Sequence, residues 1–371
     1  MKLLRKTLFK YCSNRKSNLM KKKEIAIIVF YLIGVYFFID CKSGKERKDL
    51  KPHYTENGFK NPSSKFIRHG FGAMVKWRWN RDELIQSSTD PKNYQFAQIK
   101  NDGKILRENN SNFSATWIGH ATVLVQIEGK NILTDPIWSD RCSPVKFAGP
   151  KRYTKPGVAL DDLPKIDLVI ISHNHYDHLD TETLIALEKK FQPLFLAGLG
   201  NEKFLKNLGL SKVKELDWWD EVQEKEMKIT FTPTQHFSGR KITDLDKTLW
   251  GSYVVSGIKK KFYFSGDTGY FEGFKEIGEK FPDLDLAILP IGAYEPRWFM
   301  SPMHVDPHQS VQAFLDLKAK YMIPMHYLTF VLTDEALDEP LRLAYSEFEN
   351  RNISLEKLLG LKIGESFFFD E

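Results

Sequence analysis

Short apolar runs that end in polar residues recur along the chain and predict β-strands. The first, ATWIGHATVLVQIEGKNILTDP at residues 115–136, is typical of a strand, a turn and a second strand. Single strands are predicted at 166–172, 227–236, 261–269, 283–292 and 321–326. Most of these runs end at or near a histidine or an aspartate. Because the loops at strand ends vary over a rigid scaffold, candidate chemistry is expected there.

Between the predicted strands lie segments whose apolar residues recur at helical spacing. They cover residues 181–191, 201–209, 271–281 and 306–318. Strands that alternate with helices indicate an α/β protein built in layers. Neither an internal repeat nor a low-complexity tract interrupts residues 66–371, which we predict to form one folded domain.

The longest apolar run lies before this domain. IAIIVFYLIGVYFFI, residues 25–39, follows three lysines and precedes Asp40 and Cys41. A helix that crosses a bilayer needs about 20 apolar residues. The run is therefore short for a membrane span and fits the apolar core of a secretory signal.

Translation from Met20 would give a compact signal followed by Cys41, which resembles a bacterial lipoprotein signal, although Asp40 is atypical for that pattern. The alternatives are an uncleaved signal anchor and a buried core helix, and the flanking charges argue against the helix. We predict a signal or membrane-anchor segment at 1–41 and a tether at 42–65. The protein is then expected to be attached to the membrane of a bacterial cell envelope.

Charge is distributed unevenly. Residues 1–50 contain 13 Lys/Arg and 4 Asp/Glu, a net charge of +9. The whole chain has a net charge of +6, so the remaining 321 residues have a net charge of −3. A nucleic-acid-binding protein needs a basic face on its folded part, so nucleic acid is not expected as a partner. The cysteines, Cys12, Cys41 and Cys142, form no CxxC pair, so a metal site must use histidine and carboxylate.

The densest group of candidate ligands follows the run at 166–172. It is an H-x-H-x-D-H motif made of His173, His175, Asp177 and His178. In an extended segment alternate residues share a side, so the first three can converge while the fourth turns toward a second position.

The number of ligands indicates more than one ion. A catalytic ion typically takes three protein ligands and leaves a position for water, so four candidates in six residues exceed the need of one ion. The ends of later strands add His236, Asp267 and His326. This supply fits two metals, and imidazole with carboxylate suits zinc, iron or manganese.

The order of HxHxDH, a strand-end histidine, Gly-Asp-Thr and a late histidine resembles the metallo-β-lactamase superfamily. From about residue 60 onward, further segments resemble the N-acylphosphatidylethanolamine-hydrolysing phospholipases D within it. These segments are WIGHATVLVQ (117–126), LTDPIWSDRCSP (133–144), GPKRY (149–153), ELDWWD (215–220), QHFSGR (235–240), LWGSYVV (249–255), FSGDTGY (264–270), PIGAYEPRWFM (290–300) and HVDP (304–307). The resemblance implies a four-layer αββα sandwich with a dinuclear metal site at one edge.

The resemblance also implies a ligand set, with two zinc ions as the predicted cofactor. The first metal takes His173, His175 and His236, the second takes Asp177, His178 and His326, and Asp267 bridges both together with a hydroxide. Two cations lower the pKa of a shared water and clamp both oxygens of an in-line displacement, which suits a phosphodiester.

Three residues are candidates for a direct part in the reaction. Asp177 is expected to orient the attacking hydroxide, and His304 and Tyr176 are expected to assist near the leaving group. His304 could instead cap the helix predicted from 306, and Tyr176 could simply pack. Around the ligands, His120 and Asp135 are expected to hold metal-bound imidazoles in place, although Asp135 could instead cap a turn before proline.

Aromatic pairs suit a lipid-facing groove, so Trp218, Trp219, Trp298 and Phe299 are predicted to contact substrate. Arg297 or Arg240 is predicted to meet phosphate. The alternatives are core packing for the aromatic side chains and ordinary ion pairs for the arginines.

Together with these features, the resemblance implies a phospholipase D-type enzyme that hydrolyses N-acylphosphatidylethanolamine-like lipids to N-acylethanolamine and phosphatidic acid. Its expected partners are a phospholipid substrate and a membrane surface, and the resemblance favours a homodimer. Since fold does not fix function, one alternative is a hydrolase of another ester, lactone or phosphodiester. A second is a non-catalytic lipid-binding surface lipoprotein, against which the seven intact ligand positions argue.

Overall fold

The computed structural model describes residues 51–370, apart from residues 64, 65, 67, 82 and 111. The signal or anchor segment predicted at 1–41 lies outside the described residues. Within the described part of the chain, no helix has both the length and the apolar character needed to cross a membrane.

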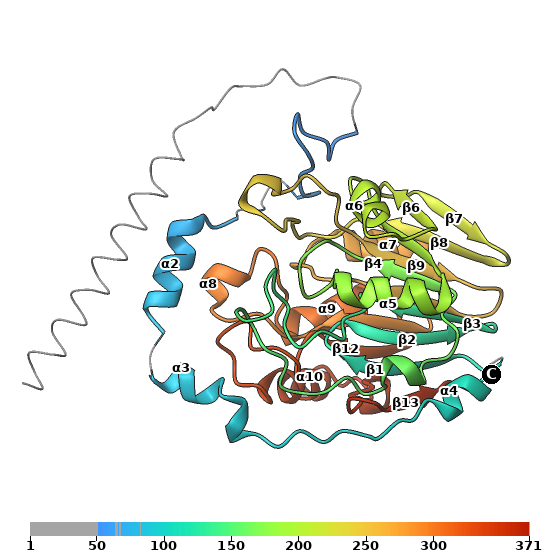
Figure 1. Ribbon diagram of the computed structural model, residues 1–371. Coiled ribbons are helices and arrows are strands. Elements are labelled where there is room, and N and C mark those ends of the chain that lie inside the picture. The colour runs from blue at the N-terminus through green and yellow to red at the C-terminus, as the bar shows by residue number, and fades with distance from the viewer. Residues whose placement is uncertain (1–50, 64–65, 67, 82, 111, 371) are drawn as a thin grey trace, which may run out of the picture. The chain divides into compact units, whose positions relative to one another are not determined.

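Two β-sheets form the centre of the described domain (Figure 1). One is ordered β13-β1-β2-β3-β4-β5-β6 and the other β12-β11-β10-β9-β8-β7. The first contains β1 (Ser114–Gly119), β2 (Thr122–Ile127), β3 (Lys130–Thr134), β4 (Leu168–Ile171), β5 (Leu194–Gly198), β6 (Val213–Leu216) and β13 (Ser366–Phe368). The second contains β7 (Glu221–Glu224), β8 (Met227–Thr232), β9 (Ser252–Ser256), β10 (Lys261–Phe264), β11 (Leu286–Pro290) and β12 (Tyr321–Met325).

Helices cover the outer faces of the sheets. Buried leucines of α5 and α6 pack on the first sheet, and α7 and α9 pack together, with α9 in contact with β11 of the second sheet. The described helices are α2 (Phe71–Trp79), α3 (Glu83–Ser88), α4 (Lys104–Glu108), α5 (Thr181–Phe191), α6 (Glu202–Asn207), α7 (Gly273–Lys280), α8 (Arg297–Met300), α9 (Pro307–Leu317) and α10 (Glu339–Asn350). The predicted four-layer αββα sandwich is confirmed.

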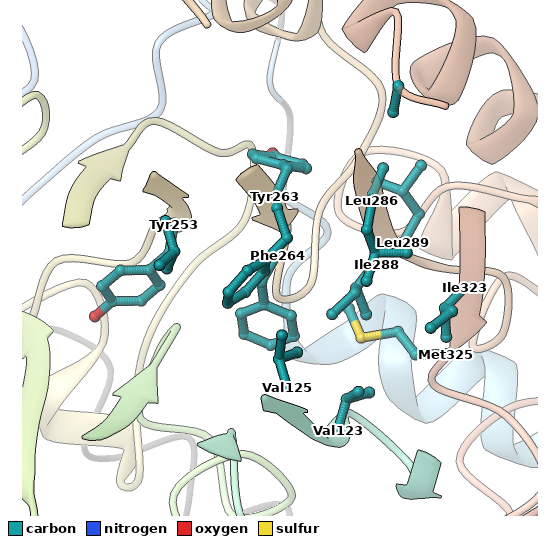
Figure 2. Close-up of a cluster of buried hydrophobic side chains, with 14 of the residues drawn as sticks. Val123, Val125, Tyr253, Tyr263, Phe264, Leu286, Ile288, Leu289, Ile323 and Met325 are labelled. Carbon is teal, nitrogen blue, oxygen red and sulfur yellow. The ribbon is translucent and has the colours of Figure 1, made fainter. Parts of the chain in front are cut away.

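The core between the sheets follows from the two-residue period of a strand. In β2, Val123 and Val125 belong to the central cluster, whereas Leu124 belongs to the cluster under α5. Figure 2 shows the two valines pointing toward Phe264 of β10 and Met325 of β12. Because both faces of each sheet are buried, little but the loops at the strand ends remains available for chemistry.

Several predicted elements are confirmed, and one is wrong. The helix predicted at 181–191 has these bounds as α5. Residues 115–136 form three strands rather than two, because tight turns follow β1 and β2, with positive φ at His120 and at Glu128. Because apolar residues stand on both sides of each turn, the sequence pattern does not show where one strand ends and the next begins.

The predicted tether at 42–65 also differs from the structure where residues are described. Residues 51–61 form a hairpin closed by a bridge between Tyr54 and Phe59. His53 is buried, and Phe59 packs against the central cluster. This segment is therefore part of the folded domain, and residues 42–50 of the predicted tether lie outside the described residues.

Candidate metal centre

Strand direction brings the predicted ligands to one place. β8 and β10 each pair antiparallel with β9, and β11 and β12 run parallel to β10, so β8, β10 and β12 point the same way. In the other sheet β1, β3 and β4 also share one direction. The loops that follow these strands therefore meet, and a hydrogen bond from His326 N to His120 O joins the two sheets there.

Three imidazoles make the first group of ligand atoms. Nε2 of His173 lies 2.8 Å from Nδ1 of His175. Nε2 of His236 lies 3.4 Å from the same Nδ1. Donor atoms of a tetrahedral ion held at about 2.1 Å are about 3.4 Å apart, so these three nitrogens have roughly the spacing of one coordination sphere.

A carboxylate and two imidazoles make the second group. Oδ2 of Asp177 is 3.4 Å from Nε2 of His178 and 3.4 Å from Nε2 of His326. The two Nε2 atoms are 3.2 Å apart. This group also has roughly the spacing expected around a single cation.

Asp267 lies between the two groups. Its Oδ2 is 3.1 Å from Nε2 of His178 and of His326, and 3.9 Å from Nε2 of His236. Its Oδ1 is buried and has no hydrogen-bond partner. An unpaired buried carboxylate oxygen costs free energy unless it binds something, so Asp267 has an open position of the kind that a cation fills.

The first group is held in the form that binds metal. Burial lowers the pKa of His175 to about 3 and that of His236 to about 4, so both rings are neutral. Burial also lowers the pKa of His173 well below its usual value. Neutral imidazole is the ligand form.

The second group favours positive charge. Burial alone would lower the pKa of His178, but the carboxylates of Asp267 and Asp177 outweigh burial and hold that pKa well above its usual value. In the same way, despite burial, Asp267 and Asp177 raise the pKa of His326 to about 9. The centre is thus an anionic, buried place suited to cations.

Asp135 is connected to an imidazole of each group. It follows β3, and its Oδ2 accepts a hydrogen bond from Nδ1 of His178 at 2.6 Å. The same oxygen accepts from Oγ of Ser172, and that hydroxyl lies 2.9 Å from Nδ1 of His173. Both rings thereby keep Nε2 free for a metal. Burial raises the pKa of Asp135, while the hydrogen bonds from His178 and Ser172 act in the opposite direction by stabilising the carboxylate.

His120 supports the second group from the turn after β1. Its Nε2 donates to Oδ2 of Asp177 at 3.0 Å, and its backbone N–H donates to Oγ1 of Thr329. His120 and His326 both have positive φ. The backbone strain that this conformation carries is typical of functional sites.

The comparisons with known proteins show the family of this chain. The model of the Beta-lactamase superfamily domain matches residues 130–327. The chain belongs to the beta-lactamase superfamily. It is 42% identical over 242 residues, 62% of this chain and 68% of the relative, to the N-acyl-phosphatidylethanolamine-hydrolyzing phospholipase D 1 of Caenorhabditis elegans.

Two further matches extend this superfamily comparison. The mitochondrial N-acyl-phosphatidylethanolamine-hydrolyzing phospholipase D of Saccharomyces cerevisiae is 37% identical over 232 residues, 61% of this chain and 49% of the relative. Igni18, a metallo hydrolase of the archaeon Ignicoccus hospitalis, superposes with a TM-score of 0.55 at 23% identity, covering 70% of this chain and all of that one. The last likeness concerns the fold alone.

The donor set fits bound metal ions. His173, His175 and His236 would hold one ion, and Asp177, His178 and His326 would hold a second, with Asp267 shared. Nitrogen donors that are neutral in the first group, carboxylate donors in the second and an open carboxylate oxygen on Asp267 suit a hydrolytic metal centre.

His304 lies at the rim of the centre. Its Nδ1 is 3.9 Å from Oδ2 of Asp267 and has no hydrogen-bond partner. The adjacent helix α9 is capped by Asp306, whose carboxylate accepts from Gln309 N, so capping does not need His304. His304 therefore has a free nitrogen beside the ligands.

The side chains of Tyr176 and Arg240 have structural contacts. The Tyr176 hydroxyl donates to the Arg240 carbonyl at 3.0 Å, and the Arg240 guanidinium stacks 4.0 Å from the Tyr176 ring. Arg240 also donates to the carbonyl of Asn174, inside the ligand motif, and to that of Leu179, directly after it. Arg240 thus holds the ligand loop from outside, and Tyr176 is its contact within the loop.

The predicted substrate contacts on α8 differ in exposure and in their partners. The Arg297 guanidinium donates to the His304 carbonyl and to Gln309, so it braces the His304 loop, and Trp298 beside it is 48% exposed. Phe299 is buried against Trp77.

Trp218 and Trp219 are not part of the centre. Trp218 is a core residue, and its Nε1 donates to the Trp250 carbonyl, so the predicted substrate contact is wrong for it. Trp219 is partly buried under Lys280, whose Nζ is 3.8 Å from the ring centroid. Two adjacent tryptophans after a strand do not by themselves indicate whether their side chains line a surface groove or pack in the core.

Sequence reasoning missed residues that act through hydrogen bonds. Ser172 links His173 to Asp135, and its place directly before the motif could have indicated this. The Met303 carbonyl accepts from Nδ1 of His236, and Asn61 contacts the His236 backbone. No local pattern marks these last two.

Proposed function

We propose that this protein is a zinc-dependent phosphodiesterase of phospholipase D type. It hydrolyses N-acylphosphatidylethanolamine-like lipids to N-acylethanolamine and phosphatidic acid. The observation that carries the proposal is the position of the Asp267 carboxylate, in reach of imidazoles from both ligand groups. The identity of 42% to the C. elegans phospholipase favours this substrate over other esters.

The proposed reaction is an attack of water on phosphorus. Two zinc ions held by the two ligand groups would lower the pKa of this water and neutralise charge on the phosphate oxygens. A bond forms from the water oxygen to phosphorus, and the bond from phosphorus to the ethanolamine oxygen breaks. The water loses a proton, and the leaving alkoxide gains one.

Residues of this chain orient the groups that react. Oδ2 of Asp177 accepts from His120, which fixes the carboxylate beside the ligands. The unpartnered Nδ1 of His304 faces the cluster. We assign His304 the transfer of the proton that the water loses to the leaving alkoxide, because general acid–base groups must lie within reach of the atoms they serve. Tyr176 acts indirectly, by holding the ligand loop through Arg240.

A surface next to the centre supports a lipid substrate. α8 leads into the His304 loop and exposes Trp298, and α2 exposes Trp79 to 73%. Two basic residues of α2, Lys76 and Arg78, lie near these indoles. Lys76 Nζ is 5.8 Å from the ring centroid of Trp298 on α8. Exposed indoles with basic side chains suit the interface of an anionic membrane.

Attachment and assembly belong to the same proposal. Residues 1–41 would hold the enzyme at the membrane of a bacterial cell envelope, as a lipoprotein through Cys41 or by an uncleaved signal anchor. Anchoring concentrates the enzyme where its substrate lies. The resemblance to the family favours a homodimer.

Purified full-length protein loaded with zinc tests the proposal on mixed vesicles. N-acylphosphatidylethanolamine is expected to yield phosphatidic acid and N-acylethanolamine in equal amounts. In water enriched in oxygen-18 the label is expected in phosphatidic acid alone, because the attack is on phosphorus.

Control substrates in the same assay are phosphatidylcholine and a simple lactone. Hydrolysis of the lactone with no turnover of any phosphodiester would replace the proposal with a lactonase function. Absence of hydrolysis from every substrate, in protein that holds its metals, would favour a lipid-binding protein instead.

A further inference from the structure

The hairpin at residues 51–61, here called the N-terminal hairpin, is fixed to the domain at its first residues. His53 Nε2 donates to Oδ1 of Asp217 at 2.6 Å, and its ring lies 4.4 Å from the Trp218 ring. Lys51 Nζ is 2.6 Å from Oδ2 of Asp217, and the Tyr54 hydroxyl donates to that oxygen. One buried carboxylate thus anchors three side chains of the hairpin.

A second anchor lies on the loop that follows His236. Phe59 N donates to the Asp246 carbonyl at 2.8 Å, and Asp246 N donates to the Ser238 carbonyl. At Gly58 a Cβ would lie 2.0 Å from the Asp246 oxygen, so a side chain cannot be accommodated there. The hairpin and the His236 loop are therefore in close main-chain contact.

Asn61, the last residue of the hairpin, forms hydrogen bonds with the backbone of a candidate metal ligand. Its Nδ2 donates to the His236 carbonyl at 2.7 Å, and its Oδ1 accepts from His236 N at 2.9 Å. The same Oδ1 accepts from Trp250 Nε1 at 3.2 Å. Two donors at the oxygen and one acceptor at the nitrogen fix the orientation of the amide.

His236 needs such support because it lies beyond the strand that carries it. β8 ends at Thr232, and after a bridge between Gln235 and Gly269 the N–H and the carbonyl of His236 have no backbone partner among the described residues. Its ring is fixed at Nδ1 by the Met303 carbonyl, and its main chain is held on both sides by Asn61. Together these contacts determine where Nε2 points.

We propose that Asn61 is a positioning residue of the metal centre. It sets the affinity of the ion held by His173, His175 and His236 through the backbone of His236, 175 residues away in sequence. The N-terminal hairpin is then part of the centre, although it supplies no ligand. This inference rests on the metal centre of the proposed function.

A merely structural role of Asn61 leads to a different expectation. If Asn61 only attaches the hairpin to the domain, its loss lowers the unfolding temperature and leaves both metal affinities unchanged. Metal affinity measured in folded protein therefore separates the two roles.

The experiment compares Asn61→Ala with Asn57→Ala, a matched change at an exposed asparagine of the same hairpin. Zinc affinities are measured by competition with a chromophoric chelator, and the ligand field by the visible spectrum of the cobalt-loaded protein. We expect Asn61→Ala to bind one of its two ions about 10- to 100-fold more weakly, the usual effect of losing an outer support. Its cobalt spectrum is expected to change, and Asn57→Ala to match wild type.

Asn61→Asp gives a second reading if the alanine variant does not fold. Aspartate keeps the oxygen for His236 N and Trp250 and loses the donor to the His236 carbonyl, so weaker binding of one ion is again expected. Wild-type affinity for both ions in either folded variant would overturn the inference. Wild-type protein that binds no metal would instead refute the proposed function.

Discussion

An Asp267→Asn variant is expected to lose roughly three powers of ten in kcat/KM on the lipid phosphodiester. Oδ2 of Asp267 lies 3.1 Å from Nε2 of both His178 and His326, and Oδ1 is buried without a partner. Replacing the carboxylate by an amide removes the negative charge shared by the two ligand groups. The metal content should fall below two per chain for the same reason.

The matched control is Asp161→Asn, which makes the same chemical change at a side chain that is 97% exposed. This variant should keep wild-type activity and metal content. Activity is measured on N-acylphosphatidylethanolamine vesicles and metal by elemental analysis of the same samples. Near-normal turnover by Asp267→Asn would contradict the assignment of Asp267 as the shared ligand.

Removal of the metal is expected to abolish activity and to lower the unfolding temperature. The centre holds the partly buried carboxylate of Asp177 and the buried carboxylate of Asp267, beside imidazoles of the first group that burial keeps neutral. Ions that bind only the folded chain stabilise it by about 4 kcal/mol when free metal is 1,000 times the Kd. Activity and unfolding temperature should both return when zinc is added back.

Addition of zinc, iron or manganese to separate samples of stripped protein identifies the ion that supports turnover. A sample treated with the zinc-saturated chelator is expected to stay active, which separates metal loss from direct effects of the chelator. Full activity in protein whose metal content is below detection would refute a metal-dependent reaction.

The candidate ligands could be predicted because each of them follows a predicted strand, and four of them form one dense motif. His173, His175, Asp177 and His178 crowd six positions directly after a buried strand, a density of ligand residues that chance rarely produces. His236, Asp267 and His326 each follow a strand, and strands of common direction bring their ends together. The alternation of strands and helices predicts an α/β protein built in layers, whereas the four-layer αββα sandwich was implied by the resemblance to the superfamily.

Contacts between segments that are far apart in the sequence could not be predicted in this way. Asn61 reaches His236 through backbone atoms, for which every residue type looks alike. Arg297 and Trp218 were assigned to substrate from residue type alone. The structure gives Arg297 a carbonyl partner and places Trp218 in the core, because burial and partners depend on packing between distant segments.

Anomalous X-ray scattering at the zinc edge, on crystals of the zinc-loaded protein, tests the central claim most directly. We predict two peaks per chain, one among His173, His175 and His236 and one among Asp177, His178 and His326, with Asp267 between them. A single peak, or no peak within this cluster, would contradict a two-metal centre.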